Sequence, residues 1–298
     1  MSSIGFAEDC VQDREQLRVL WRTCFDAEDA YQQLYFSTRY RPDQTLVFRE
    51  EGEILGMATL LPCTYRGIFQ GRERLYRASY LFAVATLPRA RGKQIATKLL
   101  QEAERYHRQW GIELAILAPA QADLYPFYQK RGYETWFYRR ECCYPPANGS
   151  ADGWELRQLH VAEYYHHHLR LMGRDAVLWP QDALIFAEGE SKLYHGGLYA
   201  LCQQGKRRAI CNLYHYVPEE WIAKELLAEP GESEEQLCSA LRGLFPQASW
   251  TVRLPAKEDP QEGQPGQKEV PAGMVRWYLP QDQRPDQTGW AYLPFILD

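Results

Sequence analysis

The segment from Arg89 to Leu100, RARGKQIATKLL, combines basic side chains, a glycine and the start of a helical pattern. The first turn of a helix presents unpaired backbone N–H groups and about half a unit of positive charge, so it is a natural seat for phosphate. Arg89, Arg91 and Lys93 add full charges, and Gly92 lets an anion approach the backbone closely. The segment predicts an anion site, although a solvated basic helix start would show the same residues.

Two common nucleotide-binding motifs do not match this segment. A Walker loop requires GxxxxGK followed by Ser or Thr, but no glycine stands at the first position and Gln94 follows Lys93. The GxGxxG fingerprint is absent as well. A nucleotide bound here is therefore held by another type of turn.

The elements that position this turn follow from the hydrophobic pattern. In chain order the pattern predicts two helices in residues 9–40, a β-hairpin at 45–62, a strand at 80–85, a helix from Ile95 to Trp110, a buried strand at 113–120, a short helix ending at Gly132 and a strand at 135–142. A strand, a crossover helix and a strand within a mostly antiparallel sheet give a mixed α/β fold with helices flanking the sheet.

Three of these segments, AVATLPRARGKQIATKLL, AILAP and FYQKRGYE, resemble in order and spacing the core of the GCN5-related N-acetyltransferases (GNAT), over about residues 10–142. The VATLPxxRGK spacing, the LAPA strand end and the two-domain length are similar to the enhanced-intracellular-survival (Eis) branch. The resemblance implies the acyl-CoA N-acyltransferase fold, acetyl-CoA as cosubstrate, and acetyl transfer to a primary amine of a small molecule or peptide. A non-catalytic acyl-CoA sensor and a purely structural module are the alternatives.

The resemblance also assigns site residues. The signature turn of the family falls on Arg91, Gly92, Lys93, Gln94, Ile95 and Ala96, and most members have glycine where this chain has Gln94. The pantetheine arm would pair with the strand at Phe82, Ala83 and Val84. Tyr128 would be the acid that protonates the CoA sulfur, and simple packing of Tyr128 on the sheet is the structural alternative.

The general base is not evident from the sequence. The strand before the turn, RASYLFAV, has no carboxylate, whereas many family members carry a glutamate there. Either a water relay does the work of the base, or a carboxylate from elsewhere in the chain does. In the resembled branch the C-terminal carboxylate reaches the site, which makes Asp298 the candidate; a plain edge strand, WAYLPFILD, explains the same residues. His166, His167 and His168 point about 100° apart on a helix and cannot share one ion, so no metal site is predicted.

The second half of the chain is predicted to be a degenerate copy of the first. A Pro/Gly-rich linker at 143–153 separates an acetyltransferase domain, 1–145, from a second domain, 154–298. There a hairpin at 198–216 precedes the predicted helix VPEEWIAKELLA, 217–228. Glu219 and Glu220 would meet a bound anion with like charge, so the half is predicted to be a degenerate acetyltransferase-like α+β lobe. Residues 255–272 are predicted to form a polar loop between two strands.

Composition narrows the class of protein. With 45% hydrophobic and 24% charged residues the chain is typical of globular proteins. Residues 1–150 carry 20 Lys and Arg against 18 Asp and Glu, and residues 151–298 carry 14 against 21, which argues against nucleic acid as a partner. The acidic second half suits a cationic acceptor, and a role in solubility alone is the alternative. No secretory signal or membrane-spanning run is found, and eight scattered cysteines fit buried thiols, so a cytoplasmic location is predicted. The sequence leaves a homo-oligomer open.

Overall fold

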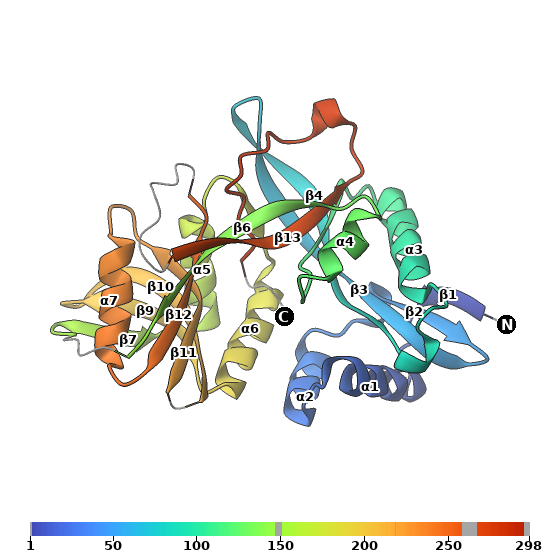
Figure 1. The fold of residues 1–298 in the computed structure, drawn as a ribbon, viewed down its shortest axis with the longest axis horizontal. Helices are drawn as coiled ribbons and strands as arrows, with labels where there is room; N and C mark the ends of the chain where they lie inside the picture. The colour runs from blue at the N-terminus through green and yellow to red at the C-terminus, as the bar shows by residue number, and fades with distance from the viewer. Residues whose placement is uncertain (1, 147–150, 218, 258–266, 295–298) are drawn as a thin grey trace.

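The computed structural model describes residues 2–146, 151–217, 219–257 and 267–294. The first half combines a pair of helices, an antiparallel run of strands and then alternating helices and strands (Figure 1). Its elements are β1 Ser2–Phe6, α1 Val11–Phe25, α2 Asp29–Thr38, η1 Pro42–Gln44, β2 Thr45–Glu50, β3 Glu53–Phe69, β4 Arg72–Thr86, η2 Pro88–Ala90, α3 Ile95–Gln109, β5 Leu114–Leu117, α4 Leu124–Gln129 and β6 Glu134–Tyr144. The predicted hairpin and helices of this half are confirmed, and β3 and β4 run further than predicted.

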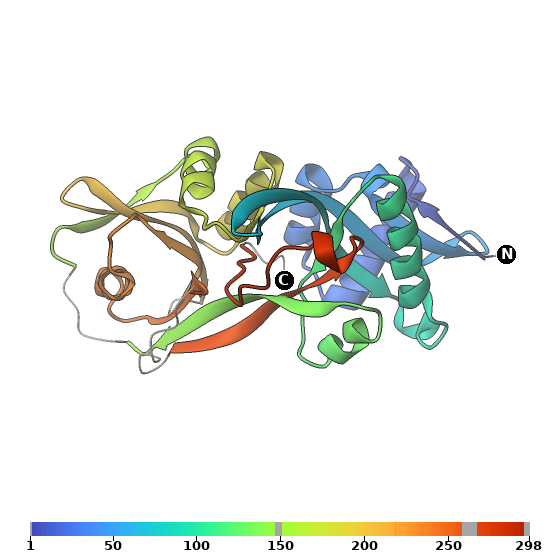
Figure 2. The ribbon, with the colours of Figure 1, turned by 90° about the horizontal axis from the view of Figure 1, so that it is seen from above.

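The second half begins with a short strand and a helix and is richer in strands. Its elements are β7 Trp154–Gln158, α5 Val161–Leu171, β8 Ala176–Leu178, α6 Gln181–Leu193, β9 Gly197–Gln203, β10 Lys206–Val217, β11 Glu220–Ala228, α7 Glu234–Leu244, β12 Ser249–Pro255, β13 Gln267–Trp277 and η3 Gln281–Gln283. Seen from above, α7 lies end-on within the curve of these strands (Figure 2). The predicted hairpin at 198–216 is confirmed as β9 and β10.

One sheet runs through both halves, in the order β1-β2-β3-β4-β5-β13-β6-β12-β11-β10-β9-β7, with β8 paired to β3 off this path. Strand β13, from near the end of the chain, pairs antiparallel with both β5 and β6. Among the described strands only β4 with β5 and β11 with β12 pair in parallel. The predicted fold class, a mixed α/β fold with a mostly antiparallel sheet flanked by helices, is confirmed, whereas the domain boundary at 143–153 stays a prediction.

Helices cover both faces of strands β2 to β4 (Figure 1). Helix α3 packs so closely on β3 that a Cβ at Gly56 would lie 2.6 Å from Cγ2 of Ile95, so this position requires glycine. On the other face Tyr35 of α2 contacts Thr59 of β3 through a hydroxyl pair at 3.3 Å. The turn before α3 is therefore held in place by a tightly packed helix behind it.

The prediction of a helix at 217–228 is wrong. Residues 220–228 form β11, which pairs with β10 on one edge and β12 on the other. The apolar residues of this segment have the three- and four-residue spacing of a helix: Ile222, Ala223, Leu226 and Leu227. A central strand is apolar on both faces, however, and carries the same residue types. Glu220 therefore begins a strand, and the comparison of Glu219 and Glu220 with a helix start no longer holds.

Two further predictions are wrong in part. The polar loop predicted at 255–272 is shorter, because β13 begins at Gln267 and pairs with β6. The C-terminal run predicted as a strand forms only an isolated bridge, Ala176 with Tyr292, within its described residues 290–294. Pro294 follows two residues after Tyr292, and the segment is held instead by single contacts such as the hydrogen bond from the N–H of Val177 to the carbonyl of Tyr292 at 3.0 Å.

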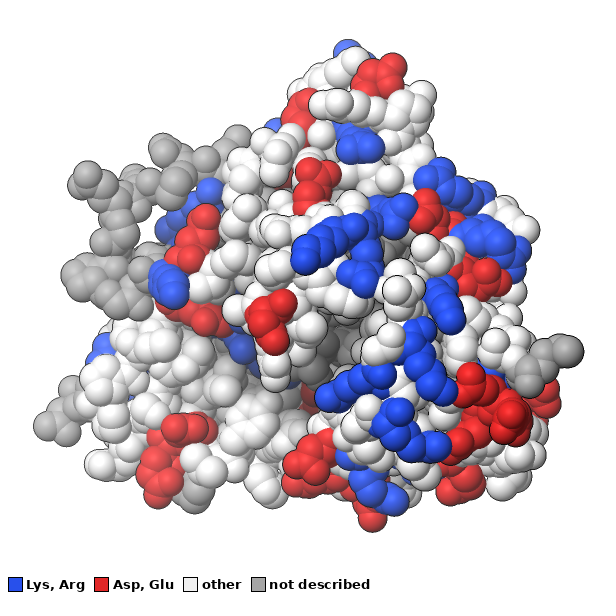
Figure 3. Space-filling model, turned by 45° about the vertical axis from the view of Figure 1, so that its right-hand side comes forward, with Lys and Arg blue, Asp and Glu red and all other residues white. Residues whose placement is uncertain are grey.

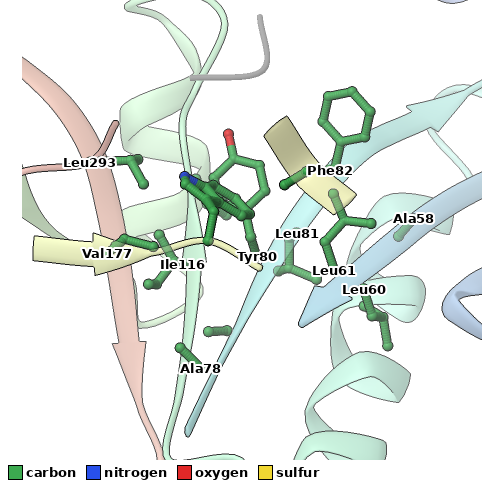
Figure 4. Packing of buried hydrophobic residues seen from close by; sticks show 14 of the residues in the cluster. Ala58, Leu60, Leu61, Ala78, Tyr80, Leu81, Phe82, Ile116, Val177 and Leu293 are labelled. Carbon is green, nitrogen blue, oxygen red and sulfur yellow. The ribbon is translucent and has the colours of Figure 1, made fainter. Parts of the chain in front are cut away.

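The two halves share a hydrophobic core around the middle of β4. Tyr80, Ile116, Val177 and Leu293, from four separate segments, lie in one cluster (Figure 4). Val177 and Ile116 are completely buried. Within the ranges described, no helix combines the length and apolar character needed to cross a bilayer.

Candidate active site

Strands β4 and β5 separate in the middle of the first half. Their parallel pairing covers only Ala78 to Tyr80 on β4, opposite Leu114 to Ile116 on β5. Just beyond, Ala83 has a φ of 51° and the register of β4 against β3 shifts, so the strand carries a bulge there. Among the described residues no strand pairs with this edge of β4 after Tyr80. An extended amide-containing ligand can therefore pair with it.

The basic turn lies where β4 leads into α3. After the short helix η2, Gly92 has a φ of 85° and Gln94, the N-cap of α3, has a φ of 60°. A Cβ at Gly92 would meet no atom within 4 Å, so the space in front of this glycine is open. The first amides of α3 have no partner within the helix. The corner thus combines free N–H groups with open space, as an anion site requires.

A cavity of about 590 Å³, here called the corner cavity, lies against this turn. The turn and the start of α3 supply one wall, with Arg91, Gly92, Gln94, Ile95, Ala96 and Thr97. The opposite sides are formed by Val84, Ala85 and Thr86 of β4, by Cys24 and Phe25 of α1, and by Gln121, Leu124, Phe127, Tyr128 and Arg131. The molecule is hollowed on this face, and Lys and Arg side chains gather beside the hollow (Figure 3).

Two of the predicted cations do not face the corner cavity. Arg89 forms an ion pair with Glu53, and the Lys93 ammonium lies 2.7 Å from the Glu50 carboxylate. Neither Arg89 nor Lys93 lines the cavity, whereas Arg91 does, and no ion pair of Arg91 is found within the described ranges. Arg91 is therefore the cation of the turn that is placed to hold an anion.

A second cavity of about 360 Å³ adjoins the first and is lined by both halves of the chain; it is here called the junction cavity. The first half supplies Trp21, Phe25, Asp26, Glu28 and Tyr31 near α1 and α2, the β4 residues Tyr80 to Val84, and Leu117, Leu124 and Tyr128. The second half supplies Glu190, Tyr194, Tyr216 and Lys224. Phe25, Val84, Leu124 and Tyr128 line both cavities, so the two spaces meet at these residues.

Tyr128 stands at this meeting point near the end of α4 and is 8% exposed. Burial raises the pKa of Tyr128 to about 12, although the nearby Arg131 guanidinium acts in the opposite direction. The phenol therefore keeps its proton throughout the physiological range. The structure places Phe82 and Ala83 on the junction cavity and Val84 and Tyr128 on both cavities, so the predicted strand and the predicted acid are brought together.

Arg131 was not singled out from the sequence, although it lines the corner cavity. Its guanidinium donates to Oγ1 of Thr97 and to the carbonyl of Phe127, and so ties α4 to the first turn of α3. The sequence signal that could have identified Arg131 is its position directly before Gly132 in the segment FYQKRGYE. Arg131 holds the two walls of the corner cavity together.

Glu190 was also missed, and a sequence signal for it exists. It follows Ala183 and Ala187 at helical spacing on the buried face of α6, where an apolar residue is expected. Asp298, the other carboxylate predicted from the sequence, lies outside the described residues. The nearest described position, Pro294, accepts a hydrogen bond from the Trp179 indole at 2.8 Å, and the Trp179 ring lies 5.2 Å from that of Tyr80.

Replacing Gln94 with glycine is expected to stabilise the protein by about 1 kcal/mol, because a non-glycine residue in the left-handed region costs roughly that much. Thermal or urea unfolding measures the change. Gln94→Ala is the matched control, since it shortens the side chain but keeps the strained φ, and it should give no such gain. Equal stabilisation by both variants would show that the side chain, and not the backbone, is the source.

Comparison with known proteins agrees with this geometry. Residues 11–136 match the family model described as an acetyltransferase (GNAT) domain. No curated protein sequence matches the chain. Among solved structures it is similar to a probable N-acyltransferase from Enterococcus faecalis V583, with 15% identity, a TM-score of 0.67 and coverage of 93% of this chain and 73% of that one.

Two further structures show the same fold. A GCN5-related N-acetyltransferase from Kribbella flavida has 16% identity and a TM-score of 0.65, over 93% of this chain and 72% of that one. Eis1 from Mycobacterium abscessus has 13% identity and a TM-score of 0.63, over 93% and 73%. Residues 11–136 therefore match the GNAT domain family, and the fold of the whole chain is similar to that of Eis1.

Proposed function

We propose that this protein transfers the acetyl group of acetyl-CoA to a primary amine. The observation that carries the proposal is that two cavities meet at Tyr128. One lies beside the open turn at Gly92 and the start of α3, and the other is lined by carboxylates and aromatic rings. A transferase needs such a junction, because donor and acceptor must enter from different sides and react at one point.

The corner cavity suits the CoA portion of the donor. The diphosphate would accept hydrogen bonds from the first amides of α3 and from Arg91, and Gly92 leaves the approach to the backbone open. The pantetheine amides would pair with the open edge of β4 beyond Tyr80. The thioester would then lie near Val84 and Tyr128, where the two cavities meet.

Acetyl-CoA supplies the activated thioester, and a side chain of the protein supplies the proton for the departing thiolate. The amine nitrogen bonds to the carbonyl carbon as the C–S bond breaks. Tyr128 donates its hydroxyl proton to the departing thiolate, and the proton that the nitrogen loses restores the phenol; the raised pKa of Tyr128 keeps its proton in place until the thiolate leaves. Burial raises the pKa of the Cys24 thiol in the same cavity. A CoA thiol there experiences the same desolvation, which brings its proton affinity closer to that of the phenol.

Release of free thiol from acetyl-CoA in the presence of a panel of amines tests the proposal. An amine-dependent release with a matching acetylated product is the expected result. Calorimetric binding of acetyl-CoA without thiol release for any amine would favour the non-catalytic sensor, and absence of binding would leave only a structural module.

The pH dependence of the reaction follows from the raised pKa of Tyr128. An acid must be protonated to act, and a pKa of about 12 keeps Tyr128 protonated far above neutral pH. We therefore expect kcat/KM to rise with pH as the acceptor amine loses its proton. Ionisation of Tyr128 should cause no decrease in kcat/KM below about pH 10. Steady-state rates in a series of overlapping buffers measure this, with circular dichroism to exclude unfolding. A phenol-like descending limb near neutral pH would contradict the assignment.

A further inference from the structure

A buried carboxylate from the second half faces the junction cavity. Glu190 of α6 is 5% exposed, and its Oε2 accepts a hydrogen bond from the Tyr214 hydroxyl. The Lys224 ammonium is 3.8 Å from Oε1 of Glu190 and lies over the Tyr214 ring, 4.4 Å from its centre. At 3.8 Å the contact is an ion pair without a direct hydrogen bond. Oε1 of Glu190 is therefore not tightly held by Lys224.

The charges that line the cavity are mainly negative. Asp26, Glu28 and Glu190 are its carboxylates, and Lys224 is the one cation that lines it among the described residues. The pKa of Tyr194 is raised by burial and further by Glu190 and Glu28, so both carboxylates act on the same hydroxyl. Glu28 and Glu190 thus gather at the end of the cavity formed by Tyr194.

Aromatic rings complete this end of the cavity. The rings of Tyr194 and Tyr216 are 4.5 Å apart, and Tyr31 of α2 lines the space with them. Ring faces next to carboxylates favour an organic cation, because the ring quadrupole and the carboxylate both attract positive charge. A carboxylate-bearing ligand would be repelled by Glu28 and Glu190, and Lys224 is the cation among the described lining residues that would attract it.

We propose that the acceptor carries a second cationic group, separated from the reacting amine by an apolar spacer, and that Glu190 receives this group. Lys224 is then an internal counter-ion that holds Glu190 in the absence of acceptor and limits how strongly a ligand ammonium is bound. The acceptor is accordingly a diamine or a larger polyamine-like cation. This inference rests on the proposed function and assigns the selection of the acceptor to the second half of the chain.

Three amines with the same carbon chain test the inference: hexylamine, hexamethylenediamine and aminocaproate. Each has six carbons, and the sixth is a methyl group, a methylene that bears an ammonium, or a carboxylate. We expect kcat/KM for the diamine to exceed that for hexylamine by about tenfold, and aminocaproate to be the poorest of the three. Equal values for all three, or a preference for aminocaproate, would overturn the proposal.

Two variants are expected to change the preference for the diamine over hexylamine in opposite directions. Glu190→Gln keeps an acceptor for the Tyr214 hydroxyl but removes the charge, so the ratio of diamine to hexylamine should fall to about one and aminocaproate should overtake the diamine beside Lys224. Lys224→Met removes the internal competitor and should raise the same ratio. A purely structural role of Glu190 would lower thermal stability and depress all three amines in proportion, which would also overturn the proposal.

Binding measured without transfer separates this inference from the proposed function. Calorimetry of hexamethylenediamine against the protein with CoA bound requires no chemistry. Suppose that the protein binds the diamine, that Glu190→Gln weakens this binding, and that no thiol is released from acetyl-CoA. This result would support the Glu190 subsite and contradict the proposed transfer reaction. Thiol release at the same rate with all three amines would support the transfer reaction and contradict the Glu190 subsite.

Discussion

Replacement of Tyr128 by phenylalanine is expected to lower kcat about 100- to 1000-fold while leaving the affinity for acetyl-CoA nearly unchanged. The phenyl ring fills the same space, so both cavities keep their shape at the point where they meet. Only the proton donor is lost, and the thiolate must then leave without it. Initial rates of thiol release give kcat, and calorimetry with acetyl-CoA gives the dissociation constant.

Tyr133→Phe is the matched control for this experiment. Tyr133 is buried, its ring lies 5.7 Å from that of Tyr128, and it lines neither cavity. Its loss of a hydroxyl should change kcat by less than about threefold. Similar losses in Tyr128→Phe and Tyr133→Phe would show that packing, not proton donation, is at stake, and an unchanged kcat in Tyr128→Phe would remove the assigned acid.

The predicted site residues that line the two cavities come from short local segments of the chain. The turn at Arg91 to Ala96 was visible because a strand, a glycine and a helical period follow one another within a short segment, and each leaves a local pattern. The structure adds what spacing cannot show, namely that Arg89 and Lys93 are directed to Glu53 and Glu50. Which cation of a basic turn faces a ligand depends on neighbouring strands.

The junction cavity could not have been predicted in the same way, because its walls come from α1, α2, β4, β5, α4, α6, β10 and β11. Glu190 was visible as a polar residue on an apolar helix face, but its partners Tyr214 and Lys224 lie on strands that only the fold brings to it. The position of β13 between β5 and β6 is likewise a long-range pairing without a local signal.

The error at β11 has a physical origin. Its residues Trp221 to Leu227 fit a helical period, and helix-forming types such as Ala, Lys, Glu and Leu dominate it. Pairing with two neighbouring strands satisfied the backbone of this segment and overrode its intrinsic preference. The consequence for function is large, because β11 carries Lys224 into the junction cavity.

Replacement of Arg91 by alanine is expected to weaken acetyl-CoA binding about 10- to 100-fold, because a charge-assisted contact to the diphosphate is lost. Arg91 lines the corner cavity beside Gly92 and the first turn of α3. The effect should shrink as salt is added, since an exposed charge is screened. The dissociation constant of acetyl-CoA by calorimetry, at low and high ionic strength, measures both.

Arg89→Ala and Lys93→Ala are controls within the same turn. Both side chains are exposed, both pair with glutamates, and neither lines the cavity, so each variant should change the dissociation constant by less than about threefold. Acetylpantetheine, a donor without the diphosphate, sharpens the test, because its KM should not distinguish Arg91→Ala from the unaltered protein. If Arg91→Ala weakens both donors equally, the guanidinium supports the shape of the turn and does not bind the diphosphate.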